Sequence, residues 1–293
     1  MEMPNLFLIG VPKAGTTSIY NLLSHSTEIF CPEIKEPHFL SLKNTFDEYI
    51  PKYAIKSQYK YLNLYKYGAG RKWKLDASVT YIYSPDTVSE LANNANNKFI
   101  VCLRKPSDAT KSMIRQRLKS INPTKRDENY YQSLIEIDNK GSRVSYPTGC
   151  FSKILFNYKD LYDYEQVIPN LVKILDKDKF LILFFEEIQE DPVNLVQKLS
   201  TFLTVDLNIV NLKKENASYE VPNSKLTSLY GKIYGVMSRY ISHNLLENNI
   251  VERIIRRYLK TGKTEVDLSG IKYLEKLDKY YEILRSSATY TSD

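Results

Sequence analysis

The stretch Leu6–Ser18, LFLIGVPKAGTTS, decides the fold of this 293-residue chain. Its first residues, Leu6–Ile9, are all apolar, without polar alternation, which is typical of a strand buried on both faces of a sheet. Gly10 ends that run, and apolar residues at helical spacing follow from Ile19 onward. The stretch therefore predicts a strand, a tight loop and a helix.

The loop between this strand and helix has the character of an anion site. Thr16-Thr17-Ser18 places hydroxyl groups at the helix start, where backbone N–H groups have no partner inside the helix. Those amides and the helix dipole favour a negatively charged ligand. Lys13 adds a cation in the middle of the loop, so the stretch predicts a phosphate site.

The rest of the chain continues the alternation of strands and helices. Further strands are predicted at 73–78, 98–103 and 179–185, and helices at 107–119, 151–175, 192–202, 225–240, 244–260 and 271–285. Another helix is predicted to start at Ser84-Pro85-Asp86. This order predicts an α/β fold, a single P-loop-like domain with a central parallel sheet flanked by helices. We expect one domain over 1–293, with its core at about 5–205 and a helical C-terminal extension at about 215–293.

The composition of the chain limits the kinds of ligand and the cellular location that we expect. The net charge of +7 and the pI of about 9.0 favour acidic ligands, but this mild excess does not indicate nucleic acid. The first apolar run is shorter than the apolar region of a signal peptide, and no positively charged segment precedes it. No stretch approaches the roughly 20 apolar residues of a membrane helix. We therefore expect a cytoplasmic protein without a membrane span.

The position of the loop lysine bears on the kind of phosphate ligand. A nucleotide triphosphatase loop reads GxxxxGK[ST], whereas Thr16 follows Gly15 here and the cation stands at Lys13. The strand at 98–103 ends in Arg104, a fixed cation suited to a second phosphate. This pattern predicts a ligand with two separate phosphates and no required metal. A P-loop kinase and a non-catalytic nucleotide- or polyanion-binding module remain alternatives.

Four segments resemble one family. PKAGTTS at 12–18 resembles the 5′-phosphosulfate loop of sulfotransferases that use 3′-phosphoadenosine 5′-phosphosulfate (PAPS), and Arg104-Lys105-Pro106 with Ser112 resembles their 3′-phosphate motif. KEPHFL at 35–40 and DASVTYIYSP at 76–85 are similar to segments of the heparan-sulfate-type and bacterial glycan branch. The resemblance covers about residues 5–115, continues more loosely at 149–203, and includes a late loop at 216–224.

The resemblance implies PAPS as the donor, adenosine 3′,5′-bisphosphate (PAP) as the product, and no metal. It implies that Lys13 holds the bridging oxygen and neutralises the leaving group. Arg104 and Ser112 would bind the 3′-phosphate. The 5′-phosphate would be held by the loop residues Ala14, Gly15, Thr16, Thr17 and Ser18.

An acceptor hydroxyl also needs a base. Glu36 matches the acid of heparan-type relatives, and in an extended segment His38 lies on the same side. We favour Glu36 as the base, with His38 assisting or positioning. The alternative is that Glu36 pairs with Lys35 or Lys13 while His38 is structural. Asp76 is a third candidate, a type of residue that more often stabilises a turn or a helix end.

The acceptor is the least defined part. The resemblance implies a glycan or glycoconjugate, sulfated on a hydroxyl or an amine, while a lipid or a small metabolite would also fit the sequence. Basic residues after the second motif could form a rim for an anionic glycan or simply a solvated helix face; they are Lys105, Lys111, Arg115, Arg117, Lys119, Lys125 and Arg126. The chain departs from the family pattern at Lys105, Ala77 and Ala109, and it lacks an arginine near Asn223. The oligomeric state is not predicted.

Overall fold

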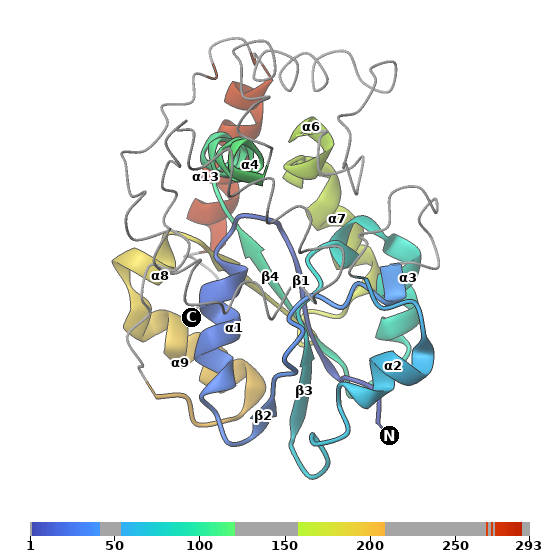
Figure 1. Ribbon diagram of the computed structural model, residues 1–293. Helices are drawn as coiled ribbons and strands as arrows, with labels where there is room; N and C mark the ends of the chain where they lie inside the picture. Colours follow the sequence, from blue (N-terminus) through green and yellow to red (C-terminus); the bar gives the residue numbers. More distant parts are fainter. Residues whose placement is uncertain are drawn as a thin grey trace, which may run out of the picture.

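A parallel sheet of five strands forms the centre of the protein (Figure 1). The computed structural model describes residues 2–41, 54–120, 158–208, 268, 271 and 273–288. The strand order is β2-β3-β1-β4-β5, and every pairing is parallel. The strands are β1 (Leu6–Gly10), β2 (Ile29–Phe30), β3 (Trp73–Asp76), β4 (Lys98–Leu103) and β5 (Phe180–Phe184). The predicted α/β fold with a central parallel sheet is confirmed.

Strand β1 occupies the middle of the sheet because its side chains are apolar on both faces. All of its residues are buried, and Phe7 stacks on Phe99 of β4 with ring centroids 5.5 Å apart. The chain crosses from β1 to β2 and β3 on one side, and then to β4 and β5 on the other. The loop after β1 therefore emerges where the strand order reverses, which is the usual place for a ligand in such sheets.

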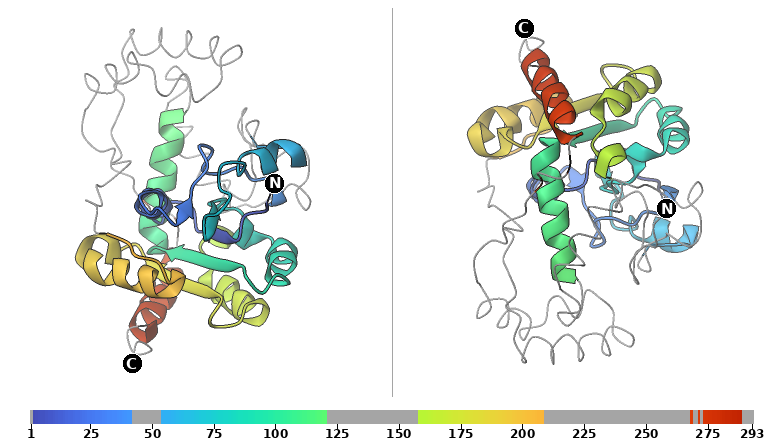
Figure 2. Two further views of the ribbon diagram at one scale, coloured as in Figure 1. Left: turned by 90° about the horizontal axis from the view of Figure 1, so that it is seen from below. Right: turned by 90° about the horizontal axis from the view of Figure 1, so that it is seen from above.

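Helices cover the sheet and extend beyond one end of it (Figures 1 and 2). They are α1 (Thr16–Ser24), α2 (Gln58–Asn63), the 3-10 turn η3 (Tyr81–Tyr83), α3 (Pro85–Ala92), α4 (Pro106–Ser120), α6 (Tyr158–Leu161), α7 (Tyr164–Ile174), α8 (Glu187–Glu190), α9 (Pro192–Leu203) and α13 (Leu274–Ala288). The C-terminal helix α13 packs against α4 and α7. Leu274, Leu277 and Tyr281 are the buried side chains of its inner face.

Three local features differ from the sequence expectation. The two-residue strand β2 is too short to leave a periodic pattern. Strand β5 is only partly buried over its first three residues, because it is the edge strand. Of the helix predicted over 151–175, the structure describes 158–175, which form the two helices α6 and α7 with Tyr162 at the break. The Tyr162 side chain is fully buried and donates its hydroxyl proton to the Pro12 carbonyl oxygen at 3.3 Å.

Several predicted segments lie outside the described residues. They are the helices at 225–240 and 244–260, the late loop at 216–224, and Arg126 and Lys125 of the basic rim. The predicted domain limits stay predictions. No helix among the described residues combines the length and the apolar character needed to cross a membrane.

Candidate active site

The loop between β1 and α1 has a backbone that requires glycine at one position. Gly15 adopts φ +82°, and a Cβ there would lie 2.6 Å from Ile188 Cδ1 and 2.9 Å from Phe185 Cδ2. Lys13 also has a positive φ, of 66°. Helix α1 begins at Thr16, so the first backbone N–H groups of the helix lie at the loop, as an anion site requires.

Arg104 joins this loop to the end of β4. Its Nη1 donates to the Lys13 carbonyl oxygen at 3.1 Å, and its guanidinium lies 4.0 Å from the centre of the Phe185 ring. The Tyr164 hydroxyl donates to the Arg104 carbonyl oxygen at 2.7 Å and so fixes its backbone. Among the described residues, the buried Nε of Arg104 has no hydrogen-bond partner. An anionic ligand here would satisfy that donor.

The start of α4 is held by the C-terminal helix. The backbone N–H of Ser107 donates to Asp278 Oδ1 at 2.9 Å, and Lys105 Nζ lies 3.4 Å from Glu282 Oε1. The Asp278 carboxylate thus accepts from one of the backbone N–H groups that have no partner at a helix start. Ser112 lies further along the same helix with a half-buried side chain, and its part in binding the donor stays a prediction.

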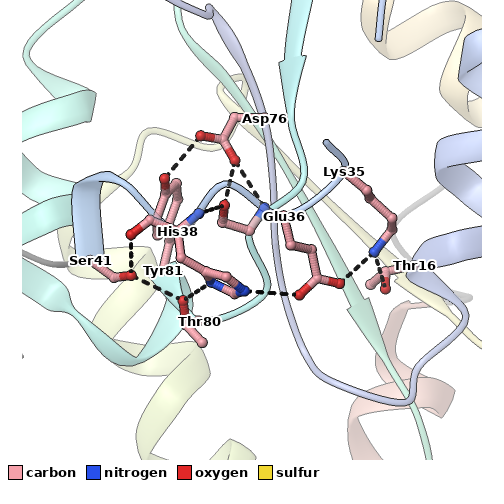
Figure 3. Close-up of polar contacts among 9 residues, drawn as sticks. Thr16, Lys35, Glu36, His38, Ser41, Asp76, Thr80 and Tyr81 are labelled. Carbon is pink, nitrogen blue, oxygen red and sulfur yellow. Dashed lines mark hydrogen bonds and ion pairs between the residues drawn. The ribbon is translucent and has the colours of Figure 1, made fainter. Parts of the chain in front are cut away.

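Glu36 lies between two basic side chains (Figure 3). Its Oε1 is 2.7 Å from Lys35 Nζ, and its Oε2 is 3.3 Å from His38 Nε2. Burial alone would raise the pKa of the Glu36 carboxyl. The positive charge of Lys35 and the hydrogen bond from His38 outweigh burial and lower the pKa to about 2. The carboxylate is therefore ionised at neutral pH, as a general base must be.

The side chains of Glu36 and His38 contact each other, but the segment is not extended throughout. His38 has φ +52° and is almost fully buried. Thr80 donates to Ser41 Oγ at 3.3 Å, and Ser41 donates to the His38 carbonyl oxygen at 3.0 Å. Thr80 Oγ1 also lies within hydrogen-bond distance of His38 Nδ1, at 2.9 Å. The imidazole is thus held on both ring nitrogens (Figure 3).

Asp76 supports this segment from the end of β3. Its carboxylate is fully buried and accepts from the hydroxyls of Tyr61 at 2.7 Å, Tyr81 at 2.9 Å and Ser78 at 2.6 Å. Ser78 Oγ in turn accepts from the His38 N–H at 3.0 Å. Burial raises the pKa of Asp76, while these hydroxyl donors oppose the rise. Asp76 therefore anchors the turn rather than facing a substrate, in agreement with the turn interpretation of the sequence.

Two contributions could not be read from the sequence. Lys35 Nζ lies 3.4 Å from Thr16 Oγ1, so the segment that carries Glu36 touches the phosphate-type loop. Asp278 comes from a helix far along the chain. The structure thus brings Lys13 and Arg104 together, and separately links Thr16, through Lys35, to Glu36 and His38. Within the described ranges, no three His, Cys, Asp or Glu side chains gather as a metal ion would require.

Comparison with known proteins identifies the family of the chain. The family model described as "Sulfotransferase domain" matches residues 3–244. No curated protein sequence matches the chain closely enough to count as a relative.

Two solved structures show the same fold. The sulfotransferase from Alicyclobacillus acidocaldarius is 21% identical with a TM-score of 0.62, and the match covers 86% of this chain and 99% of that chain. The sulfotransferase domain from the curacin biosynthetic pathway is 15% identical with a TM-score of 0.50, and the match covers 96% and 99%. The family match spans most of the chain, and the chain therefore belongs to the sulfotransferase family as a PAPS-dependent sulfotransferase.

Proposed function

We propose that the chain transfers the sulfuryl group of PAPS to a hydroxyl or amine of a carbohydrate acceptor. The observation that carries the proposal is the hydrogen bond between Arg104 and the Lys13 carbonyl oxygen. This hydrogen bond joins the Lys13 loop and Arg104 in one site, as a donor with phosphates at its 5′ and 3′ ends requires. PAPS is the donor used by this family.

The donor end is assigned as follows. The amides at the start of α1, with Ala14, Gly15, Thr16, Thr17 and Ser18, hold the 5′-phosphate. Lys13 faces the bridging oxygen, and Arg104 and Ser112 hold the 3′-phosphate. The αL backbone at Gly15 and the unpartnered Nε of Arg104 support this assignment.

The acceptor end is assigned to Glu36 as base, with His38 positioning it. The acceptor oxygen attacks sulfur, a new S–O bond forms, and the bond from sulfur to the bridging oxygen breaks. The electron pair of the broken bond stays on the 5′-phosphate of PAP, and the acceptor proton passes to Glu36. Transfer of this kind depends on positioning and on charge stabilisation. A pKa of about 2 makes Glu36 a weak base in the free protein. Its partners must therefore change as the substrates bind.

A carbohydrate acceptor is supported by the glycan-branch segments at 35–40 and 76–85. The basic residues Lys111 and Arg115 of α4 follow the second donor motif, and they suit an anionic glycan. The cytoplasmic location and the acceptor's position of sulfation stay predictions.

Ligand stabilisation tests the donor assignment, because a ligand that binds the native state raises its stability. We expect PAP to raise the melting temperature well above the effect of equal ADP or ATP. Equal effects of the three nucleotides would contradict the assignment. Transfer of radiolabelled sulfate from PAPS should then be compared on a desulfated heparan-type oligosaccharide, a neutral oligosaccharide and a phenol. Transfer only to the phenol would overturn the carbohydrate proposal, and PAP binding without transfer would favour a non-catalytic module.

A further inference from the structure

Lys35 lies where the two halves of the site meet. Its Nζ is 2.7 Å from Glu36 Oε1 and 3.4 Å from Thr16 Oγ1, and the side chain is 20% exposed (Figure 3). One ammonium group thus contacts both the loop assigned to the donor and the carboxylate assigned as base. None of the roles assigned above uses this cation.

The order of groups in the reaction places the sulfuryl group beside Lys35. In an in-line displacement, sulfur lies between the leaving oxygen and the attacking oxygen. The leaving oxygen of PAPS is assigned to the loop before α1, which begins at Thr16. The attacking oxygen of the acceptor is assigned to a position beside Glu36. The group in transfer therefore occupies the space between Thr16 and Glu36, and the ammonium of Lys35 touches both of these residues.

The hydrogen-bonding capacity of Lys35 fits this position. An ammonium group has three N–H donors, and the two described contacts, to Glu36 and Thr16, use two of them. One N–H remains for a ligand oxygen. Thr16 Oγ1 accepts from Lys35, and no contact among the described residues uses its hydroxyl proton, which can therefore point toward the ligand. Without a cation here, the carboxylate of Glu36 would repel the negatively charged sulfuryl oxygens.

We propose that Lys35 is a further catalytic residue that binds the non-bridging oxygens of the transferring sulfuryl group while holding Glu36 beside it. This inference rests on the proposed function. Lys13 then acts on the leaving oxygen, and Lys35 acts on the group that moves. When the sulfuryl oxygens bind, the positive charge of Lys35 is shared between them and Glu36, so the carboxylate becomes a stronger base only when the donor is present.

PAPS and PAP test this assignment because they differ only in the sulfuryl group. Both are titrated calorimetrically into the full chain without acceptor. We expect Lys35→Met to lower the affinity for PAPS by about 10-fold or more, as for loss of a charge-assisted hydrogen bond. Its affinity for PAP should fall by less than about threefold. Lys35→Arg should retain most of the PAPS affinity, and Lys35→Gln should resemble Lys35→Met. Lys66→Met, at an exposed lysine of the turn after α2, should bind both ligands as wild type does.

The outcomes separate this inference from the proposed function. Wild-type protein that binds neither ligand contradicts the proposed function itself. Wild-type protein that binds both, with a Lys35→Met variant that binds PAPS normally or loses both ligands equally, overturns only the assignment of Lys35. A selective loss of PAPS supports it, and PAP binding shows that the variant is folded.

Discussion

Arg104 donates a hydrogen bond to the carbonyl oxygen of Lys13, 91 residues away in sequence. The contact uses the backbone carbonyl of Lys13 and not its side chain. Arg104 also lies over the Phe185 ring, whose Cδ2 limits the space at Gly15. The loop and the arginine therefore form one packed unit. A change in either should weaken the binding of both phosphates of the donor.

Arg104→Lys should lower the affinity for PAP by about 10-fold or more, because lysine lacks the rigid planar set of N–H donors that a guanidinium group presents. Isothermal titration with PAP measures the effect. Arg71→Lys, at an exposed arginine before β3, is the matched control and should bind PAP normally. Unchanged affinity in Arg104→Lys would show that the guanidinium does not contact the ligand.

Gly15→Ala should destabilise the fold more than Gly70→Ala does. Both glycines have a positive φ, of +82° and +78°, but a Cβ at Gly70 meets nothing within 4 Å. Gly70→Ala then measures backbone strain alone, about 1 kcal/mol, whereas Gly15→Ala adds overpacking of roughly 1–3 kcal/mol against Ile188 and Phe185. Urea unfolding of the two variants checks this. Equal losses would mean that the loop can move away from Phe185.

Glu36→Gln should change how stability depends on acid pH. The pKa of Glu36 is lowered from 4.5 to about 2 in the folded protein, so its contribution is present above about pH 4.5 and is lost as the pH falls toward 2. The stability advantage of wild type over the variant should therefore shrink as the pH falls through this range.

Urea unfolding at pH 6, 4 and 3 measures this stability difference. Glu33→Gln, at an exposed neighbour, controls for the loss of one negative charge. A difference that stays constant or widens in acid would be incompatible with an ion pair at Glu36.

Asp76→Asn should lower turnover while PAP binding stays near wild type, because Asp76 supports His38 rather than the donor loop. Asparagine keeps the size but turns one acceptor into a donor that faces hydroxyl groups, at a cost of about 1–3 kcal/mol. Sulfate transfer and PAP titration, measured together, separate the two effects. Asp86→Asn, at an exposed position in α3, is the control. Loss of PAP affinity matching the loss of turnover would argue for a general structural defect.

The sheet and the donor loop were predictable because their signals are local. An unbroken apolar run such as Leu6–Ile9 identifies a buried strand, and Gly15 before a run of hydroxyl residues identifies the helix start. The end of β4 placed Arg104 at the same edge of the sheet, since parallel strands end together. These inferences need only neighbouring residues and the rule that βαβ units are parallel.

The surroundings of Glu36 were not predictable to the same degree. The sequence offered Lys35 or Lys13 as its partner, and only tertiary contacts show that Lys35 pairs with it. The left-handed backbone of His38 departs from an extended segment, and the hydrogen bond that its N–H donates to Ser78 Oγ, just after β3, holds it there. Contacts from α13 were equally out of reach, because they depend on packing between distant segments.

Strand β1 separates the strands that support the residues proposed for the donor from those that support the residues proposed for the acceptor. Arg104 is carried by β4 on one side of β1, whereas Asp76, which anchors the segment of Glu36 and His38, ends β3 on the other side. We therefore expect substitutions along the β3 side to alter the choice of acceptor with little change in the affinity for PAP. Acceptor range in such a chain can diverge without a new donor site having to arise.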